Sequence, residues 1–191
     1  VLSTPRIDQE NEVYLDIPFS DPKLDRLFKM KEKPENLNEI QALLEIPESK
    51  QFLFQSFFTT SSPLLLDDRN YQGEGIRLRY FGHACVLVQT KSVSILFDPV
   101  ISYPLQTNEV SRYTLADLPD RIDYVVITHN HQDHIMFETL LQIRHKIGSV
   151  VFPANQIGAL EDPSIKLILK HTGFTSLIEL KEIESITLRD G

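Results

Sequence analysis

The chain has 191 residues, of which 41% are hydrophobic and 24% are charged, values that fit one ordinary soluble globular domain and exclude a disordered segment. Its formal net charge of -8 argues against nucleic acid as the main partner, because binding to phosphates requires clustered Lys and Arg. No stretch reaches the roughly 18–20 apolar residues that span a bilayer, and the single Cys85 excludes an internal disulfide, so we expect a cytoplasmic protein without a membrane span.

The first 70 residues are rich in proline and charge and carry no chemical motif, which predicts an N-terminal accessory region over residues 1–70. A helix is predicted over Asn36–Leu44, where the apolar residues share one face. The segment Gln51–Phe58 holds four of the eleven phenylalanines and is too apolar to remain in water. We expect this segment to pack on the following domain or on a partner subunit, as in a homo-oligomer.

A second region, residues 71–191, begins with short apolar or alternating runs that indicate strands. Three runs joined by short turns predict an antiparallel start to a sheet: Ile76–Tyr80, Ala84–Thr90 and Val93–Phe97. A buried strand, a helix and another strand are then predicted over Ile122–Thr128, Phe137–Lys146 and Val150–Phe152. The order strand, helix, strand indicates an α/β crossover unit.

The last part of the sequence predicts a helix, a short strand and two alternating strands, in this order: Gln156–Leu160, Ile165–Leu169, Leu177–Leu180 and Ser185–Leu188. The final residues Arg189–Gly191 have the composition of a hairpin turn and no return strand follows them. We therefore expect residues 71–191 to form a domain that is truncated at its C-terminus.

Four potential metal ligands lie within six residues, directly after the predicted strand Ile122–Thr128: His129, His131, Asp133 and His134. The carboxyl ends of strands are where α/β proteins place their sites. In a loop backbone the first two histidines can converge on one ion, and the Asp-His pair can hold a second. Imidazole and carboxylate suit zinc, and also iron or manganese. Because half of the six histidines fall in this loop, we interpret it as a metal site and not as a polar turn.

The run Thr128–His134 resembles the signature of the metallo-β-lactamase superfamily, in which two histidines bind one metal ion and an Asp-His pair binds the other. The runs Phe81–Ala84 and Phe97–Pro99 agree with the same family. The resemblance covers about residues 76–152 and implies a four-layered αββα fold of which the first half is present. It also implies that Asp98 supports the metal site through a hydrogen bond to the ligand loop, and that His83 lines the site.

For function, the resemblance implies a hydrolase in which two divalent ions, zinc above all, activate a hydroxide against a small-molecule ester, lactone, amide or phosphodiester. Asp133 is the expected catalytic residue among the ligands. One alternative is a diiron oxygenase of the amino-acid β-hydroxylase type, because those enzymes share the fold and carry an extra N-terminal region. Another is a non-catalytic module that retains half of the site.

A complete site in this family requires further ligands, and the remaining histidines do not fit that role. His145 falls within the predicted helix after the motif, and His171 falls before a glycine turn. We therefore expect the missing ligands beyond Gly191. The chain by itself should hold at most one ion, loosely, and turn over substrate poorly, although the complete protein is expected to be an enzyme. Its uncovered sheet face should favour dimerisation or aggregation. Cys85 lies inside an apolar strand and is expected in the core, with no nucleophilic role.

Overall fold

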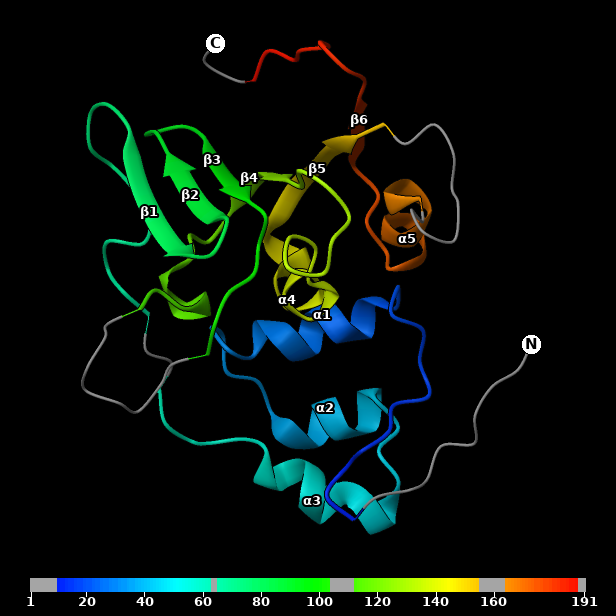
Figure 1. Cartoon of the computed structure of the whole chain (residues 1–191). Helices are drawn as coiled ribbons and strands as arrows, with labels where there is room; N and C mark the ends of the chain where they lie inside the picture. The colour runs from blue at the N-terminus through cyan, green and yellow to red at the C-terminus, as the bar shows by residue number, and fades with distance from the viewer. Residues whose placement is uncertain (1–9, 63–64, 104–111, 155–163, 189–191) are drawn as a thin grey trace.

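The computed structural model describes residues 10–62, 65–103, 112–154 and 164–188. These residues form an α/β fold around a six-stranded sheet whose strands lie in chain order, β1 to β6 (Figure 1). The strands are β1 Arg77–Gly82, β2 Cys85–Gln89, β3 Ser94–Phe97, β4 Ile122–Val126, β5 Ile147–Pro153 and β6 Leu177–Leu180. The α-helices are α1 Pro22–Lys29, α2 Leu37–Leu43, α3 Gln51–Ser56, α4 Phe137–Ile143 and α5 Ile165–His171.

The direction of the strands changes at β3. The strands β1, β2 and β3 pair antiparallel through short turns, whereas β3 to β6 pair in parallel. A parallel pair requires a crossover connection, and α4 and α5 lie in the connections that lead into β5 and β6. The predicted antiparallel start and the predicted crossover unit are therefore confirmed.

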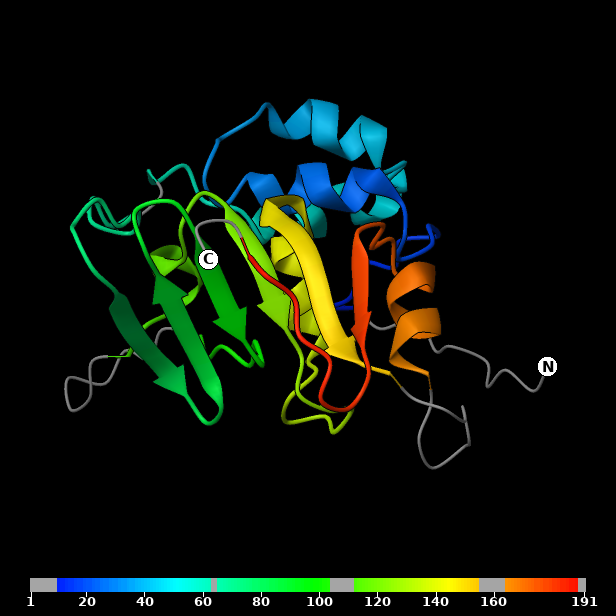
Figure 2. The same cartoon turned by 90° about the horizontal axis from the view of Figure 1, so that it is seen from above.

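One face of the sheet carries the main hydrophobic core. Leu87, Leu96, Val125 and Val150 lie side by side across β2 to β5, and none of them is more than 1% exposed. Full burial of an aliphatic side chain of this size contributes roughly 1.5–3 kcal/mol. The helix α4 lies behind this face in Figure 2, and the N-terminal helices α1 and α2 lie beyond it.

The opposite face of the sheet carries a second apolar row, formed by residues that pair directly from β1 to β6: Tyr80, Val86, Phe97, Val126, Val151 and Ile178. At the β1 end of this face, Leu78 and Tyr80 are 67% and 63% exposed. Figure 2 looks onto this face, and among the described residues it is the segment after β6 that crosses it. Both faces of the sheet thus carry apolar side chains, but the helices of the described ranges cover only one of them.

The N-terminal region has a hydrophobic cluster of its own, built around four buried residues: Ile40, Leu44, Ile46 and Phe54. The predicted helix over Asn36–Leu44 is confirmed, and Asn36 caps it by accepting a hydrogen bond from the Asn38 backbone N–H. The helix α1 was missed, although Asp21 followed by Pro22 is a typical helix start. The helix contains many charged residues and only one buried residue, Leu24, so the sequence shows no clear apolar face.

The phenylalanine-rich segment does not pack on the sheet domain, and this part of the expectation is wrong. As helix α3 it directs Phe54 into the N-terminal cluster, where the ring of Phe58 lies 4.9 Å from that of Phe54 between centroids. Phe52 and Phe57 remain 85% and 58% exposed. The helical period of this short segment thus places some of its phenylalanines in the cluster and others in solvent. A role of the segment in a homo-oligomer stays a prediction.

Two other predicted elements are wrong. Residues Ile165–Leu169 form part of the helix α5, because Ser164 caps it and Ile165 and Leu169 lie one turn apart on its buried side. Residues Ser185–Leu188 alternate like a strand but form none, since β6 pairs with β5 and the structure gives this segment no neighbouring strand. The helix predicted over Gln156–Leu160 and the turn over Arg189–Gly191 lie outside the described residues.

Polar contacts attach the N-terminal helices to the sheet domain. The buried Arg144, at the end of α4, donates hydrogen bonds to the Asp25 carboxylate at 2.8 Å and to the Asp21 carbonyl at 2.9 Å. Next to it, Lys146 forms an ion pair with Glu32. Helix α1 therefore rests on α4 and on the turn that follows it, as Figure 1 shows.

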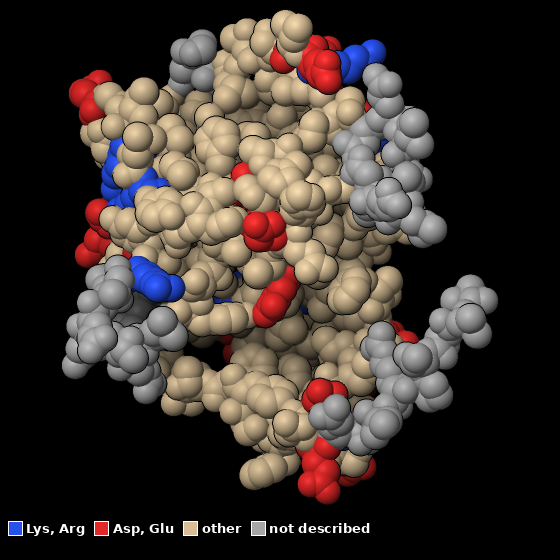
Figure 3. All heavy atoms as spheres, viewed as in Figure 1, with Lys and Arg blue, Asp and Glu red and all other residues tan. Residues whose placement is uncertain are grey.

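Basic side chains on the face shown in Figure 3 gather mainly beside β1, at the left edge, and do not form a broad basic surface. Near this edge Arg79 pairs with Asp68 at 2.6 Å, and Arg69 pairs with Asp120 at 2.8 Å. These arginines act as structural links between the linker before β1 and the sheet. None of the helices in the described ranges combines the length and the apolar character needed to cross a bilayer.

Candidate metal centre

The four predicted ligands occupy the loop between β4 and α4. The backbone N–H groups of His134 and Ile135 both donate to the carbonyl of His131, at 2.9 Å each, which folds the loop into a tight turn. This turn follows the buried end of β4, where Ile127 donates to the carbonyl of Val151. A rigid sheet edge therefore sets the position at which the loop begins.

Three imidazole rings meet in this loop. The ring of His129 lies 4.6 Å from that of His131 and 3.9 Å from that of His134, measured between centroids. The three predicted histidine ligands therefore lie close to one another. His131 is exposed, while His129 and His134 are half-buried.

Asp98 lies beneath the loop, at the end of β3, and is only 3% exposed. Its Oδ1 accepts the backbone N–H of Thr128 at 2.8 Å, and its Oδ2 accepts the hydroxyl of Thr128 at 2.8 Å. The Nδ1 of His134 lies 2.9 Å from the same Oδ2. A carboxylate that accepts a hydrogen bond from the Nδ1–H of a histidine fixes the orientation of the ring and leaves Nε2 free to bind a metal ion.

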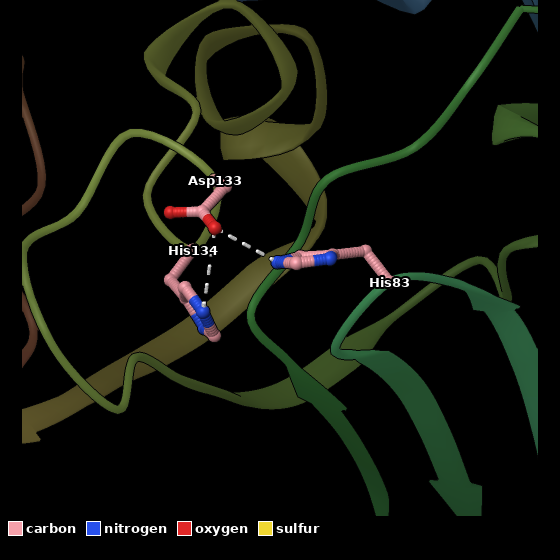
Figure 4. Close-up of side chains that lie close together, drawn as sticks. All are labelled: His83, Asp133 and His134. Carbon is pink, nitrogen blue, oxygen red and sulfur yellow. Dashed lines mark ion pairs between the residues drawn. The ribbon is translucent and has the colours of Figure 1, made fainter.

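A group of three side chains has the spacing expected of metal ligands (Figure 4): His83, Asp133 and His134. Their ligand atoms all lie within 4.8 Å of one another. The Asp133 Oδ2 lies 3.1 Å from Nε2 of His83 and 3.9 Å from Nε2 of His134. His83 reaches this group from the turn between β1 and β2, so the site joins the antiparallel and the parallel halves of the sheet.

The charge of Asp133 is favoured by its surroundings. Its pKa is lowered, first because the carboxylate accepts a hydrogen bond from its own backbone N–H, and further because His134 and His83 lie nearby. A carboxylate that stays ionised is the form that binds a cation. Asp133 is 61% exposed, so a ligand or an ion can reach it from solvent.

Thr128 is a contributor to the site that the sequence analysis did not single out. Its hydroxyl lies 2.8 Å from Asp98 Oδ2 and 2.9 Å from Nδ1 of His129, and thus links the buried carboxylate to a second histidine. The signal in the sequence is its position, because a hydroxyl residue directly precedes the ligand run at the end of a strand. Threonine is also common in strands, which hides this signal.

The other two histidines lie outside this group, and the cysteine lies in the core. His171, the last residue of α5, is exposed, with Nδ1 2.8 Å from the carbonyl of Leu167. His145 lies beside α1, where burial lowers its pKa and, within the described residues, its two ring nitrogens have no hydrogen-bond partner. Cys85 is fully buried, and burial raises the pKa of its thiol to about 12, which disfavours a thiolate nucleophile.

Two family models match the chain. Residues 77–182 match the "Beta-lactamase superfamily domain", and residues 1–63 match the "Diiron non-heme beta-hydroxylase N-terminal domain". The first match covers the whole sheet, from β1 to the residues just after β6. The second falls entirely within the N-terminal helical region, which the sequence analysis left without a motif.

The chain is 36% identical over 190 residues to the 4-amino-L-phenylalanyl-[CmlP-peptidyl-carrier-protein] 3-hydroxylase of Streptomyces venezuelae, a match that covers 97% of the chain and 36% of that protein. The crystal structure of CmlA, a diiron beta-hydroxylase from the same organism, superposes with a TM-score of 0.77 at 34% identity, over 97% of this chain and 34% of that one. The UPF0173 metal-dependent hydrolase of Ignicoccus hospitalis is 38% identical over 84 residues, which cover 43% of the chain and 33% of that protein.

These relatives correct the functional expectation. The hydrolase interpretation is wrong, because the hydroxylase matches 97% of the chain while the hydrolase from I. hospitalis matches 43%. Metal binding is supported by both kinds of relative, but zinc is not, since the hydroxylase structure is that of a diiron protein. Ligand chemistry alone misled here, because imidazole and carboxylate suit zinc and iron alike.

The observed fold and the family match agree with each other. Its six-stranded sheet places a His- and Asp-rich loop at the end of β4, and the beta-lactamase superfamily model spans the sheet and this loop. The relatives are enzymes, and the chain spans about a third of the length of the hydroxylase. The chain belongs to the beta-lactamase superfamily and has the metallo-β-lactamase fold.

Proposed function

We propose that this chain supplies ligands to the diiron centre of a β-hydroxylase that acts on an aminoacyl group carried by a peptidyl carrier protein. The observation that carries the proposal is the extent of the likeness to the S. venezuelae hydroxylase, which covers 97% of the chain and so includes the N-terminal helices. A relative that shared only the metal domain would support the fold without this substrate class.

The donor set fits iron. We assign His129 and His131 to one ion, and Asp133 and His134 to the other. Imidazole and carboxylate are the usual ligands of non-haem iron. The contact between His134 Nδ1 and Asp98 leaves Nε2 of that ring for the ion.

Bound iron would supply the activation of dioxygen that β-hydroxylation requires. In the overall reaction a C–H bond becomes C–OH, one oxygen atom enters the product, and the other leaves as water with two protons and two electrons from an external reductant. The ligand residues of this chain would hold the ions. Asp133, whose lowered pKa keeps it ionised, contributes negative charge between His83 and His134.

Anaerobic titration of the chain with Fe(II) tests the ligand assignment. The variants His129→Ala and Asp133→Ala are expected to weaken iron binding at least about tenfold, because each removes a ligand from a small set. The matched control is His171→Ala, which removes an exposed histidine outside the site and should leave binding unchanged. Equal affinity for all four proteins would refute the assignment.

The substrate class is tested with an aromatic aminoacyl group loaded on a carrier protein. Incubation of the β-hydroxylase that contains this chain with iron, dioxygen and a reductant should add one oxygen atom to the aminoacyl group, detected by mass spectrometry, and Asp133→Ala in that protein should abolish the gain. The free amino acid should react poorly. Hydroxylation of the free amino acid at the same rate would contradict the carrier-bound substrate.

A further inference from the structure

The turn between β1 and β2 holds a histidine in a conformation that favours glycine. Gly82 pairs with Cys85, so His83 and Ala84 form a two-residue hairpin turn. His83 has a φ of 49°, in the left-handed region, where a side chain is strained. Two-residue turns with positive φ usually contain glycine or asparagine for this reason. A histidine at this position costs stability that a glycine would not.

Burial does not compensate for this strain. The side chain of His83 is 50% exposed, so it contributes little to the hydrophobic core. What the conformation does is aim the imidazole at the ligand loop. Its Nε2 lies 3.1 Å from Asp133 Oδ2, and its ring lies 5.1 Å from that of His134. Strained residues of this kind collect at functional sites, where the position of the side chain outweighs the cost.

We propose that His83 is a positioning residue for the metal centre: its Nε2–H donates to the Asp133 carboxylate and holds it beside Nε2 of His134. Without this donor an exposed aspartate on a loop samples several rotamers, and the ion has to select one of them. With it, the two ligands of one ion are already arranged. The inference rests on the proposed metal centre and adds a residue from outside the ligand loop.

Three variants of the chain separate site positioning from a role in folding. His83→Gly relieves the strain and removes the donor. His83→Gln keeps an N–H donor at a similar reach from the backbone, whereas its amide is a poor metal ligand. Ile183→Gly is the matched control for strain, because Ile183 also has a positive φ, of 62°, and its side chain is fully exposed.

Thermal unfolding in the presence of a chelator provides the first readout. Both glycine variants are expected to unfold at the wild-type temperature or up to about 2–4 °C above it, because each relieves a left-handed residue. Anaerobic Fe(II) titration provides the second. His83→Gly is expected to bind iron about 10–100-fold more weakly, the usual effect of losing a group that orients a ligand, while His83→Gln and Ile183→Gly stay within about threefold of wild type.

X-ray absorption at saturating iron completes the test by counting imidazole ligands, and the count should be the same in wild type and His83→Gly. A lost imidazole would make His83 a ligand and overturn the positioning role. Unchanged iron affinity in His83→Gly would overturn it as well, and so would a drop of several degrees in its unfolding temperature. If the wild-type chain itself fails to bind iron, the metal-centre proposal fails first, and this inference fails with it.

Discussion

The two faces of the sheet are built from the same kind of side chain but have different surroundings. On the covered face Leu96 is fully buried beneath α4 and its neighbours, whereas on the other face Leu78 is 67% exposed. Both positions follow from strand alternation, which separates the faces without telling which of them is covered. The covered face carries most of the buried apolar side chains of the domain, whereas the open face, within the described residues, exposes apolar side chains at its β1 end.

The largest difference between the faces should appear when a leucine is truncated on each. Leu96→Ala is expected to lower the free energy of unfolding by roughly 2–5 kcal/mol, because it removes transfer energy and leaves a cavity. Leu78→Ala on the open face should cost less than about 1 kcal/mol. Urea unfolding of both variants measures the contrast. Similar losses would mean that the open face is covered in solution.

A second prediction concerns the N-terminal helices that pack over the covered face. Arg144→Met removes the side chain that joins Asp25 and the Asp21 carbonyl to the end of α4. The Asp25 carboxylate loses this donor, whereas the Asp21 carbonyl still accepts the backbone N–H of Leu24. Because Asp25 is 25% exposed and partly solvated, we expect a loss of about 2–3 kcal/mol, below that of a fully buried pair.

The control for this prediction is Arg121→Met, which breaks the ion pair of an exposed arginine with Asp123 and should change stability by no more than about 0.5 kcal/mol. Urea unfolding gives both values, and proteolysis of residues 10–62 reports whether the helices detach. An equal, small effect in the two variants would show that the N-terminal helices are held by their apolar contacts alone.

The stability of the fold should also depend on pH through His145, which lies beside α1. Burial lowers the pKa of this histidine, and Glu32, Asp25, Lys146 and Lys29 surround it. A lowered pKa means that the unfolded chain takes up the proton first. Stability is therefore complete above about 6.5, the unfolded pKa, and declines as the pH falls towards the folded value. In the His145→Gln variant the unfolding temperature should fall less steeply as the pH drops below 6.5 than it does in wild type. An unchanged slope would mean that carboxylates cause the pH dependence.

The smallest effect on stability, and the clearest effect on association, is expected on the open face. Tyr80→Lys places a charge in the exposed apolar row and should change the free energy of unfolding by less than about 0.5 kcal/mol. If copies of the chain associate through this face, the variant should shift them towards monomer in sedimentation velocity. Wild-type chain that is monomeric at high concentration would show that the open face does not self-associate.

Local patterns were enough to predict much of the fold. Apolar and alternating runs identified β1 to β4 and β6 closely, and the ligand run after β4 was visible as a cluster of histidines. The same patterns failed where helix and strand look alike, as in α5, a short apolar run whose capping serine decides its form. Local patterns also could not predict which metal binds, because zinc and iron use the same donor atoms.

By itself the sequence determined which residues are the candidate metal ligands, since the run from His129 to His134 is contiguous and its pattern is local. Only the tertiary structure decided how they are supported. Asp98 meets His134 from 36 residues away, and His83 reaches Asp133 from a different pair of strands. Contacts of this kind depend on the order in which strands pair and on one strained turn. A sequence pattern records residue types and spacing, and carries no direct measure of either.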